Sequence, residues 1–149
     1  KNKGFFMSKI QAPIQGFNVA LRATYWHAWE ILRFRHRGAG LLMSDMALLT
    51  VCCMGVLAVL ATAILTPSSA VPHHPLYVAA IMAATFACCF SFCGRICAAG
   101  FAVTIIATEP VAIVLRLAGL EEVDVLFTIW VIAGQLIFFF RAAGAEKRA

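Results

Sequence analysis

Residues 46–65 read MALLTVCCMGVLAVLATAIL and contain no charged side chain. A helix of about 20 apolar residues is as long as the hydrocarbon core of a bilayer is thick. Ser44 and Asp45 come directly before this stretch and suit the start of a helix, because serine caps the first amides and an acidic group favours the positive end of the helix dipole. The stretch therefore predicts a membrane-spanning helix that begins near Asp45.

The composition of the whole chain agrees with this one segment. Hydrophobic residues make up 62% of the 149 positions and charged residues only 13%, whereas about a quarter of a soluble domain is charged. In water such a chain would have too little polar surface to cover its core. In lipid the outer surface can be apolar as well. We therefore expect an all-α integral membrane protein.

Residues 1–40 are interpreted as a basic amphipathic arm. The first 16 residues contain Pro13 and scattered polar side chains and are expected to be extended. From Phe17 to Arg37 apolar residues recur at helical spacing on one side, and charged residues occupy the rest. This segment has too many charges to cross a bilayer. We predict a helix that lies along the membrane surface or against a partner.

Four side chains of this arm are candidates for contact with lipid headgroups or with an acidic partner subunit. Tryptophan rings suit the headgroup level, where one side is apolar and the other wet, and arginine pairs with phosphate. The candidates are Trp26, Trp29, Arg33 and Arg37. An alternative is a quinone or lipid site lined by the first three of these residues.

Residues 76–120 allow two topologies. Few residues interrupt their apolar character: Gly94, Arg95, Glu109, Pro110 and Arg116. Either Gly94-Arg95 is a tight turn between two spans, or one long helix runs from 76 to 107 and stops before Pro110. The first topology has four spans and the second has three. Charge placement favours four, because both termini and Arg95 then lie on one basic side, opposite the acidic residues of 119–124.

The last span is expected at Val125–Phe140, so the transmembrane domain covers residues 41–141. The loop at 67–75 contains three prolines and is expected to be a fixed turn, since proline cannot continue a helix. Residues 142–149 include Lys147 and Arg148 and are interpreted as a basic tail.

Arg95 and Arg116 are expected to reach lipid phosphates near helix ends, as long basic side chains do at membrane interfaces. No cofactor is predicted within the chain itself. Bound anionic phospholipids, such as cardiolipin, are the expected ligands of these basic positions.

Glu109 has two interpretations. An ionised carboxylate in the middle of a span costs several kcal/mol, so it would be protonated, paired or open to a watery cavity, as in proton or ion transport. Alternatively, Glu109 ends a helix at the interface and Pro110 starts the next one. The second interpretation is favoured at this point.

Histidine and cysteine do not predict a metal or haem site. His73 and His74 are adjacent, and His27 and His36 lie outside the predicted spans, whereas a membrane haem needs histidines at matched depth in different helices. The cysteines lie in apolar runs, where Cys89, Cys93 and Cys97 recur every four residues, and are interpreted as small packing residues. No nucleotide-binding or catalytic motif is found.

These features favour a non-catalytic accessory or scaffold subunit of a multisubunit membrane complex. Small-residue faces favour partner helices, and the basic arm suits docking rather than binding to nucleic acid. The arm, the cysteine-rich spans and a first residue other than Met suggest a mitochondrial inner-membrane complex, of the respiratory chain or ATP synthase. The alternative is a small transporter or proton- or ion-conducting protein that uses Glu109.

Overall fold

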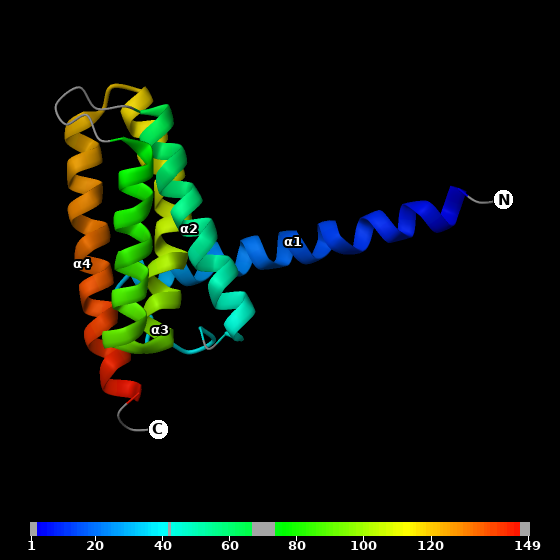
Figure 1. Ribbon diagram of the computed structural model, residues 1–149, viewed down its shortest axis with the longest axis horizontal. Coiled ribbons are helices and arrows are strands. Elements are labelled where there is room, and N and C mark those ends of the chain that lie inside the picture. Colours follow the sequence, from blue (N-terminus) through cyan, green and yellow to red (C-terminus); the bar gives the residue numbers. More distant parts are fainter. Residues whose placement is uncertain (1–2, 42, 67–73, 147–149) are drawn as a thin grey trace.

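The computed structural model describes residues 3–41, 43–66 and 74–146, and their side chains at 18–41, 43–66 and 74–142. These residues form helices and no strand, which confirms the expected all-α class. Four helices are assigned: α1 (Lys3–Leu32), α2 (Asp45–Leu65), α3 (Pro75–Leu117) and α4 (Glu121–Glu146). Of these, α2, α3 and α4 are long and apolar enough to cross a membrane. Figure 1 shows them as an upright bundle, with α1 running out from its side.

The chain reverses direction inside α3. Gly94 has φ 83° and ψ 178°, a backbone conformation that only glycine adopts readily. The ring centroids of Phe86 and Phe101 lie 5.3 Å apart, although 15 residues of continuous helix would separate them by about 22 Å. Figure 1 shows the two halves, residues 75–93 and 95–117, running in opposite directions. The bundle therefore has four antiparallel segments of crossing length, and the single long helix considered from the sequence is wrong.

The two ends of the bundle differ in charge. One end, here called the basic end, holds the Gly94 turn, the start of α2 and the last turns of α4, with Arg95 and Arg141. The other, here called the acidic end, holds the turn at 118–120 and the acidic first turn of α4. This is the distribution that favoured four spans in the sequence.

The basic arm differs from its predicted form at both ends. α1 begins at Lys3, so the extended lead-in over residues 1–16 is wrong from Lys3 onward. Pro13 lies inside the helix, although an internal proline costs about 3 kcal/mol relative to alanine. At its other end the helix stops at Leu32 and does not reach Arg37.

A Schellman motif ends α1. The amide of Arg35 donates to the carbonyl of Glu30 at 2.9 Å, and the amide of Phe34 donates to Ile31 at 2.9 Å. Phe34 occupies the left-handed position with φ 58°, where glycine is usual. This turn sends the chain back along the helix and brings His36 against α1. Arg141 of α4 donates to the Phe34 carbonyl and ties the turn to the bundle.

Small residues build a close-packed core near the basic end. Cys97, Ala98 and Ala99 are almost completely buried, and they pack with Phe138 of α4 and Ile31 of α1. A Cβ atom on Gly100 would lie 2.2 Å from the Phe138 ring, so only glycine allows this approach. Cys89 and Cys93 border the same cluster, which agrees with the interpretation of these cysteines as packing residues.

The predicted cap of α2 is present, and both ends of α4 differ from the prediction. Ser44 caps α2, because its Oγ accepts the Ala47 amide at 3.3 Å. α3 begins at Pro75, although residues 67–73 of the preceding loop lie outside the described part. α4 starts at Glu121 and not at Val125, since acidic side chains stabilise the first turn of a helix. It ends at Glu146, so part of the predicted tail is helical, while Lys147 and Arg148 are not described.

Candidate functional site

Glu109 lies inside the bundle and not at a helix end. α3 continues through Pro110 to Leu117, eight residues beyond Glu109, a rise of about 12 Å. The favoured sequence interpretation, in which Glu109 ends a helix at the interface, is therefore wrong. Pro110 is tolerated inside a helix at this depth because neighbouring helices can compensate for the missing amide.

Thr62 of α2 is the hydrogen-bond partner of Glu109. The Thr62 hydroxyl lies 2.5 Å from Oε2 of Glu109 and 3.1 Å from the carbonyl oxygen of Ala58. A hydroxyl has one proton and can accept through its oxygen. If Glu109 is ionised, Thr62 donates to the carboxylate. If Glu109 is protonated, it donates to Thr62, which then donates to Ala58. The geometry provides a complete arrangement for either protonation state.

A pocket of about 310 Å³ opens beside Glu109 between the second half of α3 and α4. Polar and charged side chains line part of it, and aromatic and aliphatic side chains line the rest. The polar ones are Thr108, Glu109, Arg116, Thr128 and Gln135. A water molecule occupies about 30 Å³ in the liquid. The pocket is large enough for a small group of waters within a segment of crossing length.

Gln135 of α4 has an unmet hydrogen-bond requirement at this pocket. Its side chain is only 8% exposed, and Nε2 has no hydrogen-bond partner among the described residues. A buried amide left without a partner costs about 1–3 kcal/mol. The sequence reasoning missed Gln135. The signal that could have found it is a lone amide in an otherwise apolar span.

Arg116 and Asp124 form an ion pair near the acidic end. Nε of Arg116 donates to Oδ2 of Asp124 at 2.8 Å, across the turn between α3 and α4. The Asp124 side chain is 11% exposed and that of Arg116 is 41% exposed. Arg116 also lines the pocket that contains Glu109. Contact of Arg116 with lipid phosphate remains a prediction.

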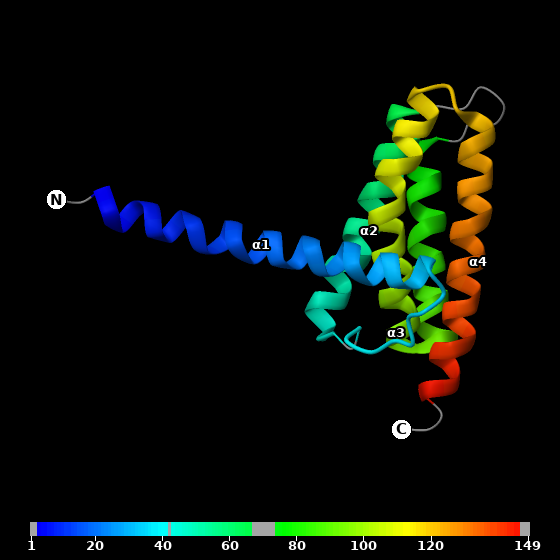
Figure 2. The same ribbon diagram turned by 180° about the vertical axis from the view of Figure 1, so that it is seen from behind.

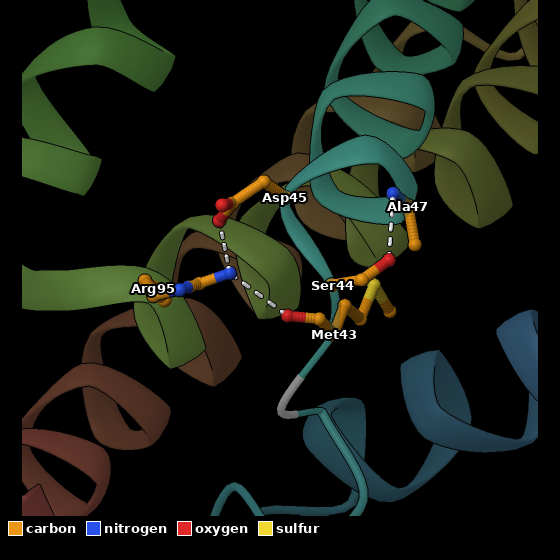
Figure 3. A network of polar contacts seen from close by, with 5 residues as sticks. All are labelled: Met43, Ser44, Asp45, Ala47 and Arg95. Carbon is orange, nitrogen blue, oxygen red and sulfur yellow. Dashed lines mark hydrogen bonds and ion pairs between the residues drawn. The ribbon is translucent and has the colours of Figure 1, made fainter.

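Arg95 joins the Gly94 turn to the start of α2. Figure 3 shows its Nη2 between the carboxylate of Asp45 and the carbonyl of Met43, which accepts at 3.0 Å. Nε of the same guanidinium is buried and has no partner among the described residues. Asp45 itself is 87% exposed. The arginine is held in place, and its predicted contact with lipid remains untested.

The candidate residues of the arm lie at and beyond the end of α1. Trp26 and Trp29 are more than half exposed, and the guanidinium of Arg33 lies 5.7 Å from the centroid of the Trp29 ring. Arg37 is exposed in the following turn. Ala28 and Ile31, by contrast, are buried against the bundle. The structure places these candidates on an uncovered surface.

His27 and His36 form a pair that the sequence did not predict. Nδ1 of His36 accepts the amide of Gly38 at 2.9 Å, so the proton of its neutral ring is on Nε2. That nitrogen lies 2.7 Å from Nδ1 of His27, to which it donates. Burial lowers the pKa of both rings. Nearby His27 lowers the pKa of His36 further, against an opposing effect of Glu30. The sequence interpretation put both residues on one helix and missed the reversal at Phe34.

Within residues 3–41, 43–66 and 74–146, no group of three or more histidine, cysteine, aspartate or glutamate residues could hold a metal ion. His73 lies outside these ranges. Comparison with family models, curated proteins and solved structures finds no match to this chain.

Proposed function

We propose that this chain is a non-catalytic subunit of a larger membrane assembly and that α1 docks it to a neighbouring subunit. The observation that carries the proposal is the position of α1, which extends away from the bundle over most of its length (Figures 1 and 2). Its 30 residues rise about 45 Å. Isolated helices gain little stability from propensity alone and need a surface to pack on.

The exposed side of α1 has the composition of a protein-binding surface. Arg22, Trp26, Trp29 and Arg33 lie within about 60° of one another at 100° per residue, and we call them the aromatic–basic face. Ala28, by contrast, points about 130° away from its centre, toward the bundle. Tryptophan and arginine are enriched among the residues that contribute most to protein interfaces. The charge of this face fits an acidic surface of a partner subunit.

Native electrophoresis in mild detergent, with mass spectrometry of the co-migrating chains, tests this role. The double variant Trp26→Ala/Trp29→Ala is expected to release the chain from a set of partners that the wild type retains. Leu21→Ala is the matched control, because it removes an exposed apolar side chain from another side of the same helix. A wild-type chain that migrates alone at about 16 kDa would contradict the proposal, and so would equal partner sets in all three proteins.

The proposed compartment is the mitochondrial inner membrane, and the proposed assembly is a respiratory-chain complex or ATP synthase. The basic arm and the cysteine-rich spans support this choice. We expect the chain to be recovered in purified inner membranes, to resist extraction by carbonate, and to co-purify with a respiratory complex or ATP synthase. Recovery in another membrane would overturn it.

We propose anionic phospholipids as additional ligands of Arg33, Arg37 and Arg95, because basic side chains beside a membrane attract anionic headgroups. Native mass spectrometry of the purified chain is expected to show retained cardiolipin or another anionic lipid. Retention should fall in Arg33→Gln/Arg37→Gln. Equal retention in the wild type and this variant would contradict the assignment.

A further inference from the structure

We propose that Glu109 is a reversible proton-binding site, which exchanges its proton with water that enters the α3–α4 pocket from the acidic end. This inference goes beyond the proposed role as a subunit, because it concerns chemistry inside the bundle. It rests on the pocket, on the two hydrogen-bond arrangements at Thr62 and on the unpaired amide of Gln135.

The surroundings of Glu109 permit both protonation states. An ionised carboxylate accepts from Thr62 at 2.5 Å, and a protonated one donates to the same hydroxyl, which has the Ala58 carbonyl 3.1 Å away as its own acceptor. Changing the state therefore needs only a reorientation of the Thr62 hydroxyl hydrogen. A carboxyl group held by a fixed cation would lack this freedom.

Among the described residues, no basic side chain forms an ion pair with Glu109. The nearest candidate by position, Arg116, pairs instead with Asp124 at 2.8 Å. Thr62 is the polar group that α2 supplies, while α4 supplies Gln135 and Thr128 at the pocket. The hydrogen-bond partner of Glu109 is thus neutral, and the Arg116–Asp124 pair lies on the side of the acidic end.

The pocket gives the proton a path to the aqueous phase. Its volume of about 310 Å³ includes the surroundings of both Glu109 and Arg116, and Arg116 is 41% exposed near the helix end. The Gln135 amide, which is 8% exposed and unpaired, requires an acceptor on the opposite wall. Water supplies that acceptor and also carries protons.

A lipophilic carbodiimide is the probe for such a site, because it adds to protonated carboxyl groups in apolar surroundings. The acid transfers its proton to one carbodiimide nitrogen, and its oxygen bonds to the central carbon. The acyl group then moves to nitrogen, so the reagent is added whole and nothing is oxidised or released. The experiment uses the full chain in lipid vesicles over a pH series, with the adduct located by mass spectrometry.

The expected result is an adduct on Glu109 whose yield rises as the pH falls, and which Glu109→Gln abolishes. Thr62→Val removes the hydroxyl that donates to the carboxylate and should move the labelling profile to higher pH. Thr50→Val is the matched control, since Thr50 lies on the same helix and donates only to the Met46 carbonyl at 2.7 Å. Its profile should equal that of the wild type.

Three results would overturn the proposal. They are absence of an adduct on Glu109 at every pH, a yield that does not change with pH, and equal profiles for Thr62→Val and Thr50→Val in chains that elute alike on size exclusion. These outcomes are independent of whether the chain has partner subunits, because the experiment uses the isolated protein.

Discussion

The second half of α3 and α4 pack closely against each other in one region and leave a pocket between them in another. At the basic end, Ala99 and Gly100 let Phe138 and α1 approach closely, and the core cluster there is apolar. Between this core and the acidic end, the same α3 and α4 separate around a pocket with Glu109 and an unpaired Gln135. A close-packed region is stabilised by its contacts, whereas a region that keeps polar groups unsatisfied accepts a cost in stability. The difference indicates that the contact of α3 with α4 and α1 near the basic end stabilises the bundle more than the α3–α4 pocket region does.

One substitution made at both ends should give the largest contrast. Ala99→Val adds two methyl groups where Ala99 is completely buried in the core cluster, and we expect it to lower the free energy of unfolding by about 3 kcal/mol. Ala112→Val adds the same atoms beside the pocket and should cost less than about 1 kcal/mol. Unfolding by detergent titration, followed by circular dichroism, measures both. Equal losses would show that the acidic end is packed as tightly as the basic end.

The ion pairs of the two ends allow a second comparison. Asp124→Asn removes the charge of a side chain that is 11% exposed and leaves Arg116 without its partner. A loss of about 1 kcal/mol is expected. Asp45→Asn changes a side chain that is 87% exposed beside Arg95, and its effect should stay below about 0.5 kcal/mol because solvent screens the pair. The same unfolding titration measures both losses. A larger loss for Asp45→Asn than for Asp124→Asn would show that Arg95–Asp45, and not Arg116–Asp124, is the stronger ion pair.

The smallest expected effect is a pH dependence of the junction between α1 and the bundle. Burial lowers the pKa of His27 and His36 below the ordinary value of about 6.5. Below about pH 6.5 the unfolded chain therefore binds more protons than the folded one. The contribution of the neutral histidine pair to the free energy of unfolding is complete above that pH and is lost as the pH falls. Melting temperatures measured at pH 7.5 and at about pH 5 should show the loss. The double variant His27→Gln/His36→Gln should lose less stability between these two pH values than the wild type. An equal loss in the variant and the wild type would refute the role of the two histidines.

The sequence predicts the class and the outline of the bundle because lipid imposes a simple rule. A segment without charge and of the right length must be a helix that satisfies its own backbone, which accounts for α2 and the Ser44 cap. Charge placement also favoured the reversal at Gly94. The ends of α1 and α4 were harder, since Phe34 takes a position usual for glycine and acidic residues extend α4 at its start.

The candidate site was only partly predictable, because its character depends on which helices meet. Glu109 stood out as a carboxylate in an apolar run, but the sequence cannot show that Thr62, 47 positions earlier, is its partner. Gln135 was not predicted, since its importance comes from the absence of a hydrogen-bond partner for its buried amide once the described helices pack. The contact of His27 with His36 depends on a turn that no glycine or proline marks.

A distance between the two halves of α3 tests the four-segment bundle most directly. Probes placed at Ala80 and Val111 through noncanonical amino acids leave all six cysteines unchanged, and both positions are exposed. The reversal at Gly94 predicts that the backbones at these positions lie about 10–15 Å apart in lipid, the spacing of neighbouring antiparallel helices. A continuous α3 would place them about 46 Å apart, and that result would contradict the bundle.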